Sequence, residues 1–397
     1  MANRIIKRLK QSRNKYRIIH RDIRYIYIMI LGWICLLTAC EERSKEIAVV
    51  DFGKECTTDL RERLECRFIV LETNDSVLLN DIDRVCWVDN RIFVLDRRKT
   101  NAVYAFDDRG RFIAQIGSQG QGPGEYVDVT HFFVDEKARI LTLADFSGTA
   151  LLRYDLDTYQ YISTLDVDYF VDCAPLGDDN WIWYMPIGFA TPRREKFYLK
   201  TTGKGGEQTA LLAPAYFTSG HTVNGSKTFH SFGGDLYAHF PFTSTVWRMR
   251  GEDLEPCYEI RFGDKRMPSA EYVDEKGRGG RDFTNELFSS GYVYSFWLYE
   301  TERFLQTTYM RNKTTYFGFY DKEAKESFTY AFTDFIRATG LTGFYGVCGT
   351  YKDYFVGKIS ARVLLRNQVS QDELRRISKQ CMEDDNPILC LFKIKKP

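Results

Sequence analysis

The residues of this sequence that could bind a metal ion or transfer a proton are few and widely spaced. Beyond residue 40 the histidines are His131, His221, His230 and His239, and none of them belongs to an HExxH motif. Because zinc and similar ions need several converging ligands, this spacing predicts no metal site and no cofactor. His239 lies in an apolar, strand-like segment, and we keep it as a ligand-binding candidate because a closed sheet could bring it near other polar groups.

Two aspartates are the carboxylates best placed for acid–base chemistry or ligand binding. Asp96 and Asp145 end similar apolar runs and stand 49 positions apart. The competing interpretation is local, because Asp side chains often accept hydrogen bonds from the backbone of their own turn. No G-x-S-x-G motif is present, so the sequence offers no serine nucleophile of that type.

A glycine-rich loop, GSQGQGPGEY at 117–126, suggests phosphate binding at first sight. A phosphate-binding P-loop needs Gly-Lys-Ser/Thr, and a dinucleotide fingerprint needs a helix to follow, whereas the residues after this loop form a strand-like run. We interpret the loop as a tight connection between sheets. The alternative is that Gln121, Glu125 and Tyr126 face a ligand at one mouth of the fold.

The spacing of the short apolar runs predicts the fold. FVLD at 93–96 is echoed by LTLAD at 141–145, and VYAFD at 103–107 by LLRYD at 151–155, which is an offset of 48 or 49 residues. Such an offset is typical of the four-stranded repeat of a β-propeller. Weaker units follow at 169–214, 227–263, 291–333 and 343–361. We therefore predict an all-β, six-bladed propeller with four-stranded blades.

A closed ring also needs its first and last strands to meet, because open sheet edges attract other chains. The runs 67–71 and 388–394 are both strand-like, and we expect them to share the final blade. A short helix is predicted at 283–288. A second is predicted at 370–383, with Ser370 and Glu373 as a capping box and Leu374, Ile377 and Cys381 on its buried face.

The first residues have the order of a bacterial lipoprotein signal. Nine Lys and Arg lie between positions 4 and 24, an apolar run covers 25–37, and Leu37-Thr38-Ala39 precedes Cys40. We predict that residues 1–39 are removed, that Cys40 is lipidated, that 40–65 form a tether and that 66–397 form the propeller. This places the protein on a membrane of the bacterial cell envelope, most simply the outer membrane. An uncleaved membrane anchor, and export to the cell surface, stay open.

Charge and cysteine content narrow the partners and the chemistry. After residue 39 the chain has 46 Lys and Arg against 53 Asp and Glu, a formal charge of −7, so we expect no nucleic acid partner. Eight cysteines remain without any CxxC pair, and most lie in apolar runs, which favours buried free thiols. The pairs Cys56/Cys66 and Cys381/Cys390 are the candidate disulfides.

The glycine loop also carries a family resemblance. Val94-Leu95-Asp96, Phe106-Asp107 and Gly110 resemble an NHL-type propeller repeat, and GQGPGEY at 120–126 resembles the signature of the six-bladed β-propeller lipoproteins. Leu71-Glu72-Thr73 and Asn386-Pro387 are similar to that family as well. The resemblance implies the propeller fold and an envelope lipoprotein of the TolB-like kind, and it implies no catalytic residues.

Two functions are compatible with these observations. The first is a non-enzymatic binding or scaffold module for a glycan, a peptide or a partner protein in the envelope. The second is a propeller hydrolase or lyase that acts on a glycan or lactone through axial carboxylates or histidines and a divalent ion. The missing catalytic motifs favour the first.

Overall fold

The computed structural model describes residues 47–147, 149–167, 170–177, 179–184, 199–202, 208–211, 227–251, 253–276 and 281–395. Its compact unit begins at Ala48. Residues 1–39 and Cys40 lie outside the described part, so their predicted cleavage and lipidation stay predictions. Within the described part, no helix combines the length and the apolar character needed to cross a membrane.

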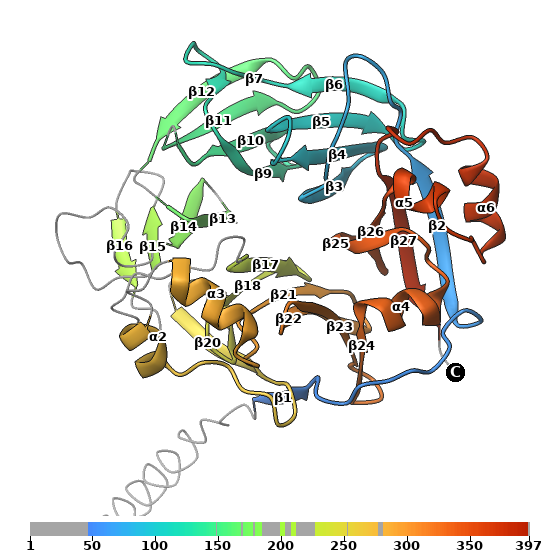
Figure 1. Ribbon diagram of the computed structural model, residues 1–397. Coiled ribbons are helices and arrows are strands. Elements are labelled where there is room, and N and C mark those ends of the chain that lie inside the picture. The colour runs from blue at the N-terminus through green and yellow to red at the C-terminus, as the bar shows by residue number, and fades with distance from the viewer. Residues whose placement is uncertain are drawn as a thin grey trace, which may run out of the picture. The chain divides into compact units, whose positions relative to one another are not determined.

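Six antiparallel sheets form a ring, and each is one blade (Figure 1). Blades 1 and 2 contain β3 (Arg84–Val88), β4 (Arg91–Asp96), β5 (Ala102–Asp107) and β6 (Phe112–Ile116), then β9 (Val129–Asp135), β10 (Ile140–Asp145), β11 (Ala150–Asp155) and β12 (Tyr161–Asp166). Blade 3 contains β13 (Asp172–Gly177), β14 (Asn180–Tyr184), β15 (Leu199–Thr202) and β16 (Gln208–Leu211).

The other three blades complete the ring. Blade 4 contains β17 (Phe229–Phe232), β18 (Asp235–His239), β19 (Thr245–Arg250) and β20 (Asp253–Arg261). Blade 5 contains β21 (Ser295–Glu300), β22 (Phe304–Arg311), β23 (Thr314–Asp321) and β24 (Glu326–Ala331). Blade 6 contains β25 (Phe344–Tyr351), β26 (Tyr354–Ile359), β27 (Ile388–Ile394) and β2 (Leu64–Val70). The six predicted repeat units are confirmed.

The burial pattern explains why the repeats could be detected. The second and third strands of blade 1, β4 and β5, are buried on both faces because neighbouring blades cover them, so their sequences are continuous apolar runs. The outer strand β12 is half-exposed or exposed throughout, and so is β6 except at the buried Ile116. Each blade thus packs most of its apolar area against the next blade.

The ring closes as predicted, by pairing of the two ends of the compact unit. β2 runs antiparallel to β27 with Phe68 opposite Cys390, and β27 in turn pairs with β26. The buried Asn386 secures the junction: its side chain accepts from the amide of Leu79 (2.7 Å) and donates to the carbonyls of Glu72 (2.6 Å) and Val77 (3.2 Å). The segments around Glu72 and Asn386, which carried part of the family resemblance, meet at this seam.

The segment expected to be a tether is in part a structural element. β1 (Ala48–Asp51) pairs in parallel with β20 and adds a fifth strand to blade 4. Phe52 and Leu60, which follow it, are buried. Within the predicted 40–65 tether, the residues from Ala48 onward therefore pack on the propeller, because they cover an outer sheet edge that would otherwise be exposed.

Helices cover the blade connections. α2 (Ala270–Lys276) and α3 (Arg281–Ser289) lie between blades 4 and 5, and α3 contains the predicted helix 283–288. α4 (Phe332–Thr339) and α5 (Ala361–Leu365) had not been predicted. α6 (Asp372–Ser378) is shorter than predicted, and the capping box is wrong, because the Ser370 hydroxyl donates to Gly340 instead of capping the helix. Leu374, Ile377 and Cys381 do face the core.

All eight described cysteines are free, as expected for most of them. The two candidate disulfides are not formed. Cys66 instead lies beside Cys390 across the β2–β27 seam, where its thiol and burial raise the pKa of Cys390.

Candidate functional site

The strand directions place all the sequence candidates on one side of the ring. In every blade the first strand is followed by antiparallel partners, so the start of the first strand and the end of the second strand lie on the same side. We call this side face A and the other side face B. Asp96, Asp145 and His239 end the second strands of blades 1, 2 and 4, so they occur at equivalent positions of face A but in different blades.

Asp96 and Asp145 are buried, and their carboxylates hold backbone amides. Asp145 accepts from the amides of Val127 (2.8 Å) and Asp128 (2.9 Å), which precede the first strand of the same blade. Asp96 accepts from Asn80 (2.7 Å) and from the amides of its own turn. Each carboxylate thus joins the segment that enters its blade to the end of the second strand of that blade. This agrees with the interpretation that these aspartates bind backbone amides. Their contact with a ligand stays a prediction.

The glycine loop forms a tight connection between blades 1 and 2. Gly117 and Gly124 adopt positive φ, and a Cβ on either would meet the ring of Tyr154 or Tyr161 at 3 Å or less, so only glycine fits there. The Tyr154 hydroxyl donates to the Gly124 carbonyl (2.8 Å), and Glu125 accepts from the amide of Gly122 (2.8 Å). Tyr126, the third candidate of this loop, is fully buried between the blades and offers no surface to a ligand, whereas Gln121 is exposed.

His239 is enclosed between blades 4 and 5. Its ring stacks on Phe296 with centroids 4.7 Å apart, and its Nε2 lies 3.0 Å from the Phe296 carbonyl. Burial, together with the nearby His230, lowers the pKa of His239 to about 3, so the ring is neutral at physiological pH. The ring packs between the two blades, and its contact with a ligand stays a prediction.

A polar cluster at the axis of face A had not been predicted. It consists of Arg84, His131, Asp172 and Lys227, which lie at or just before the first strands of blades 1 to 4. The Nε2 of His131 lies 3.2 Å from a carboxylate oxygen of Asp172. Burial lowers the pKa of His131 well below its usual range and raises the pKa of Asp172 to about 6. No signal in the sequence could have grouped these four residues, because only ring closure brings them together.

Asp172 resembles Asp96 and Asp145 in its bonding. Its carboxylate accepts from the amides of Thr228 (2.7 Å) and Phe229 (3.3 Å), at the start of blade 4, and of Cys173 (2.8 Å). It therefore ties blade 3 to blade 4. The carboxylates that could have served as catalytic groups are thus largely engaged by backbone amides, and the described residues include no group of three or more His, Cys, Asp or Glu placed to hold a metal ion.

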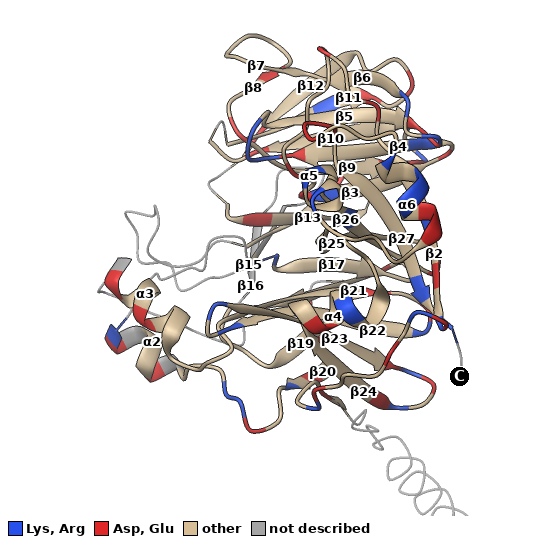
Figure 2. Cartoon of the chain, turned by 45° about the vertical axis from the view of Figure 1, so that its right-hand side comes forward, with Lys and Arg blue, Asp and Glu red and all other residues tan. Residues whose placement is uncertain are grey.

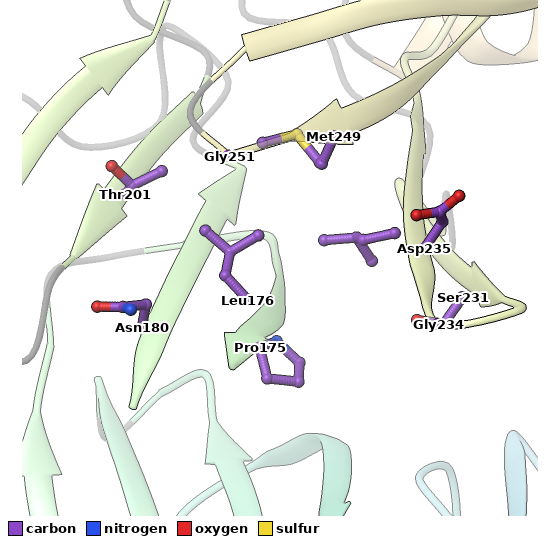
Figure 3. A pocket seen from close by; sticks show the side chains of 10 residues that line it. Pro175, Leu176, Asn180, Thr201, Ser231, Gly234, Asp235, Met249 and Gly251 are labelled. Atoms are coloured by element: carbon purple, nitrogen blue, oxygen red, sulfur yellow. The ribbon is translucent and has the colours of Figure 1, made fainter. Parts of the chain in front are cut away.

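The large cavity of the described part lies elsewhere, on face B between blades 3 and 4 (Figure 3). Its volume is about 560 Å³. It is lined by turns of both blades: Pro175, Leu176, Asn180, Thr201, Ser231, Gly234, Asp235, Leu236, Met249 and Gly251. Arg250 (2.7 Å) and Arg248 (3.6 Å) hold the carboxylate of Asp235 in place.

The cavity and the axial cluster lie on opposite faces of the ring, so they are two separate candidate sites. We favour the cavity as the candidate site, because it offers a half-open space that a ligand could fill, whereas the axial residues are mostly bonded to one another or to the backbone. A volume of several hundred Å³ is typical of sites for small molecules.

The match to a family model decides the classification of the chain. Residues 38–358 match the family DUF5128, described as a 6-bladed β-propeller. This chain belongs to that family. The match covers the ring from before β1 to the end of β26, so the resemblance to six-bladed β-propellers that the sequence showed is confirmed.

Two solved structures, both of Bacteroides proteins, share the fold of this DUF5128 protein. A Bacteroides fragilis protein, described as a candidate exported protein, is 26% identical, with a TM-score of 0.81 over 88% of this chain and 100% of its own. A member of the DUF4221 family from Bacteroides vulgatus is 10% identical, with a TM-score of 0.57 over 85% of this chain and 100% of its own, and it shows the fold alone. No curated protein matches the chain.

Proposed function

We propose that this protein is an exported, lipid-anchored β-propeller of the cell envelope that binds a saccharide in the cavity between blades 3 and 4. The description of the Bacteroides fragilis relative as a candidate exported protein supports the location, and so do the basic, apolar and Leu37-Thr38-Ala39-Cys40 segments of the N-terminus. The observation that carries the binding function is the cavity itself, with its volume of about 560 Å³.

The lining of the cavity suits the surface of a sugar. Leu176 and Met249 (Figure 3), together with Leu236, give the cavity an apolar lining, which can cover the C–H face of a pyranose ring. The Asn180 amide and the Ser231 hydroxyl form no hydrogen bond with any residue that the structure describes, so both are open to sugar hydroxyls. Asp235, fixed by its two arginines, adds a rigid acceptor. A few placed polar groups on an apolar wall are the usual composition of a ligand site.

A glycan hydrolase or lyase is the second candidate. The observation in its favour is the contact between His131 and Asp172, because a carboxyl group with a pKa near 6 could give or take a proton. Against it stand the three backbone amides that this carboxylate already accepts. Turnover of a glycan in the presence of the wild-type protein, lost in an Asp172→Asn variant, would favour the enzyme.

A glycan and peptide array tests the binding function. We expect a saccharide signal that EDTA does not remove, and we expect Ser231→Trp to abolish it, because the indole would occupy the cavity that Ser231 lines. Ser76→Trp is the matched control, since Ser76 is exposed in a turn near the β2–β27 seam. Equal saccharide signals from both variants would contradict the proposed site, and signals from peptides alone would contradict the ligand class.

The anchor is tested separately in cells. Cys40→Ala removes the thiol that would carry the lipid, so the protein is expected to leave the membrane fraction, as detected by immunoblotting of fractionated cells. Cys66→Ala, in the propeller, is the control and should stay with the membrane. If the Cys40→Ala protein stays in the membrane fraction, an uncleaved apolar anchor at 25–37 explains the attachment instead.

A further inference from the structure

Two cations at the axis of face A have no carboxylate partner among the residues that the structure describes. Lys227, just before β17, reaches across the axis: its Nζ lies 3.1 Å from the carbonyl oxygen of Asp83, before blade 1, and 2.8 Å from the hydroxyl of Tyr299 in blade 5. Both partners are neutral oxygens. The ammonium group has three donors, so at least one N–H direction is left after these two contacts.

The second cation is Arg84, at the start of β3. Its guanidinium stacks on the ring of Phe133, 5.0 Å from the centroid, and lies 5.7 Å from that of Phe132. Within the described residues it has no hydrogen bond and no ion pair through its side chain. A half-buried guanidinium that stacks on an aromatic ring is held in place but keeps its planar set of donors for another group.

The acidic groups nearby make no ion pair with either cation within the described residues, although Asp172 lies close enough to Arg84 for their charges to interact. Asp81 is paired with Lys358 (2.6 Å), and Asp83 accepts from the amide of Arg97 (2.8 Å). Asp172 is engaged by three amides and His131. Burial, followed by the positive charges of Arg84, Lys227 and Arg97, lowers the pKa of His131, which is consistent with the cations lying near this ring.

A third observation concerns an unsatisfied polar group at the residue that follows Lys227 in the sequence. The hydroxyl of Thr228, next to Lys227, is completely buried and has no hydrogen-bond partner among the described residues. The amide of Thr228 lies against the Asp172 carboxylate. Buried hydroxyls are normally bonded to protein or to ordered water, so this one calls for a partner beyond the described residues.

We propose that Arg84 and Lys227 bind a carboxylate group of a ligand at the axis of face A. A carboxylate matches the planar fork of an arginine in a bidentate contact, and it can accept a further bond from an ammonium group. Each of the two cations can donate to an oxygen of the carboxylate. The chain's excess of acidic residues argues against a polyanion, and in Figure 2 the blue and red segments alternate around the ring rather than forming one basic side. This site goes beyond the proposed function, because the saccharide cavity lies on face B.

The test is calorimetric titration of the full chain in detergent micelles with galacturonate, using galactose as the neutral match. Galacturonate is expected to bind and galactose to bind more weakly at this site. Acetate should compete with galacturonate, because the carboxylate alone makes the two contacts. Arg84→Met should weaken galacturonate binding roughly tenfold to a hundredfold, the fold-change of losing one hydrogen-bonded charge contact. Arg109→Met, at an exposed arginine of the β5–β6 turn, should leave it unchanged.

The outcomes separate this site from the cavity. Ser231→Trp should leave galacturonate binding intact, and Arg84→Met should leave the saccharide signal of the array intact. Because Lys227→Met removes contacts between blades, Lys227→Arg is the second variant; it keeps the charge and should retain most of the binding. Equal affinity for galacturonate and galactose, binding of inorganic sulfate but of no carboxylate, or unchanged affinity in a folded Arg84→Met variant would each overturn the proposal.

Discussion

Deletion of residues 386–397 is expected to abolish cooperative folding of the propeller. The deletion removes β27, so β26 loses one of its two partner strands and β2 loses its only partner within blade 6. It also removes Asn386 and the buried side chains of Ile388 and Phe392, and it exposes core residues that pack against Phe392, such as Phe335 and Phe355. Burial of one large apolar side chain contributes about 1.5–3 kcal/mol, so the loss of a whole buried strand exceeds the usual net stability of a domain.

The measurement is thermal unfolding followed by circular dichroism. The wild-type chain and a chain lacking only residues 396 and 397 should both give a cooperative transition. The chain that ends at Asp385 should give none and should be degraded rapidly by protease. A cooperative melt of the shorter chain would show that the ring does not depend on the shared blade.

A point substitution measures the contribution of Asn386 to stability separately from that of strand β27. Asn386→Ala leaves the amide of Leu79 and the carbonyls of Glu72 and Val77 without their buried partner. Each unsatisfied buried group costs about 1–3 kcal/mol, so we expect destabilisation of about 3–5 kcal/mol. The exposed Asn90→Ala change, made as a control, should alter the free energy of unfolding by less than about 0.5 kcal/mol.

Asp145→Ala is expected to destabilise the protein by about 2–4 kcal/mol without changing saccharide binding. The substitution leaves two amides, those of Val127 and Asp128, without the carboxylate that accepts from both. Asp145→Asn keeps one acceptor oxygen, so it should lower the free energy of unfolding by roughly half as much as Asp145→Ala. Chemical denaturation gives the free energies, and Asp108→Ala, at an exposed turn of blade 1, is the control.

The result separates the two interpretations of this aspartate. If Asp145→Ala unfolds at the same denaturant concentration as the wild type and loses ligand binding, the carboxylate serves a ligand and its bonds to the backbone amides have little effect on stability. If it is destabilised and still binds, binding the backbone amides is its role. The same comparison applies to Asp96, which holds the amide of Asn80 in the equivalent place of blade 1.

Local patterns of the sequence were enough to predict the ring. FVLD and LTLAD appear as continuous apolar runs because both faces of β4 and β10 are covered by other blades, and the repeat distance follows from four such strands. The shared blade could be predicted because 67–71 and 388–394 were strand-like runs without partners of their own. Asp96 and Asp145 were correctly recognised as equivalent positions.

The sites could not be predicted in the same way. Arg84, His131, Asp172 and Lys227 belong to four different blades, and no spacing along the chain relates them. The cavity depends on how far the turns of blades 3 and 4 stand apart, which no sequence pattern encodes. The capping box at Ser370 failed because a tertiary partner, the Gly340 carbonyl, competes for the hydroxyl. The segment from Ala48 to Asp51 was missed as a strand because it is short and pairs with a remote edge.

The most direct test of the central claim, that the protein binds a saccharide in the cavity between blades 3 and 4 and leaves it unchanged, is a titration followed by mass spectrometry of the recovered ligand. The saccharide with the strongest array signal would be titrated into wild-type protein, incubated for a day and recovered, with and without EDTA. The account predicts saturable one-to-one binding, loss of binding in Ser231→Trp, and full recovery of the intact saccharide under both conditions. Cleaved or eliminated product, or binding that persists in Ser231→Trp, would contradict it.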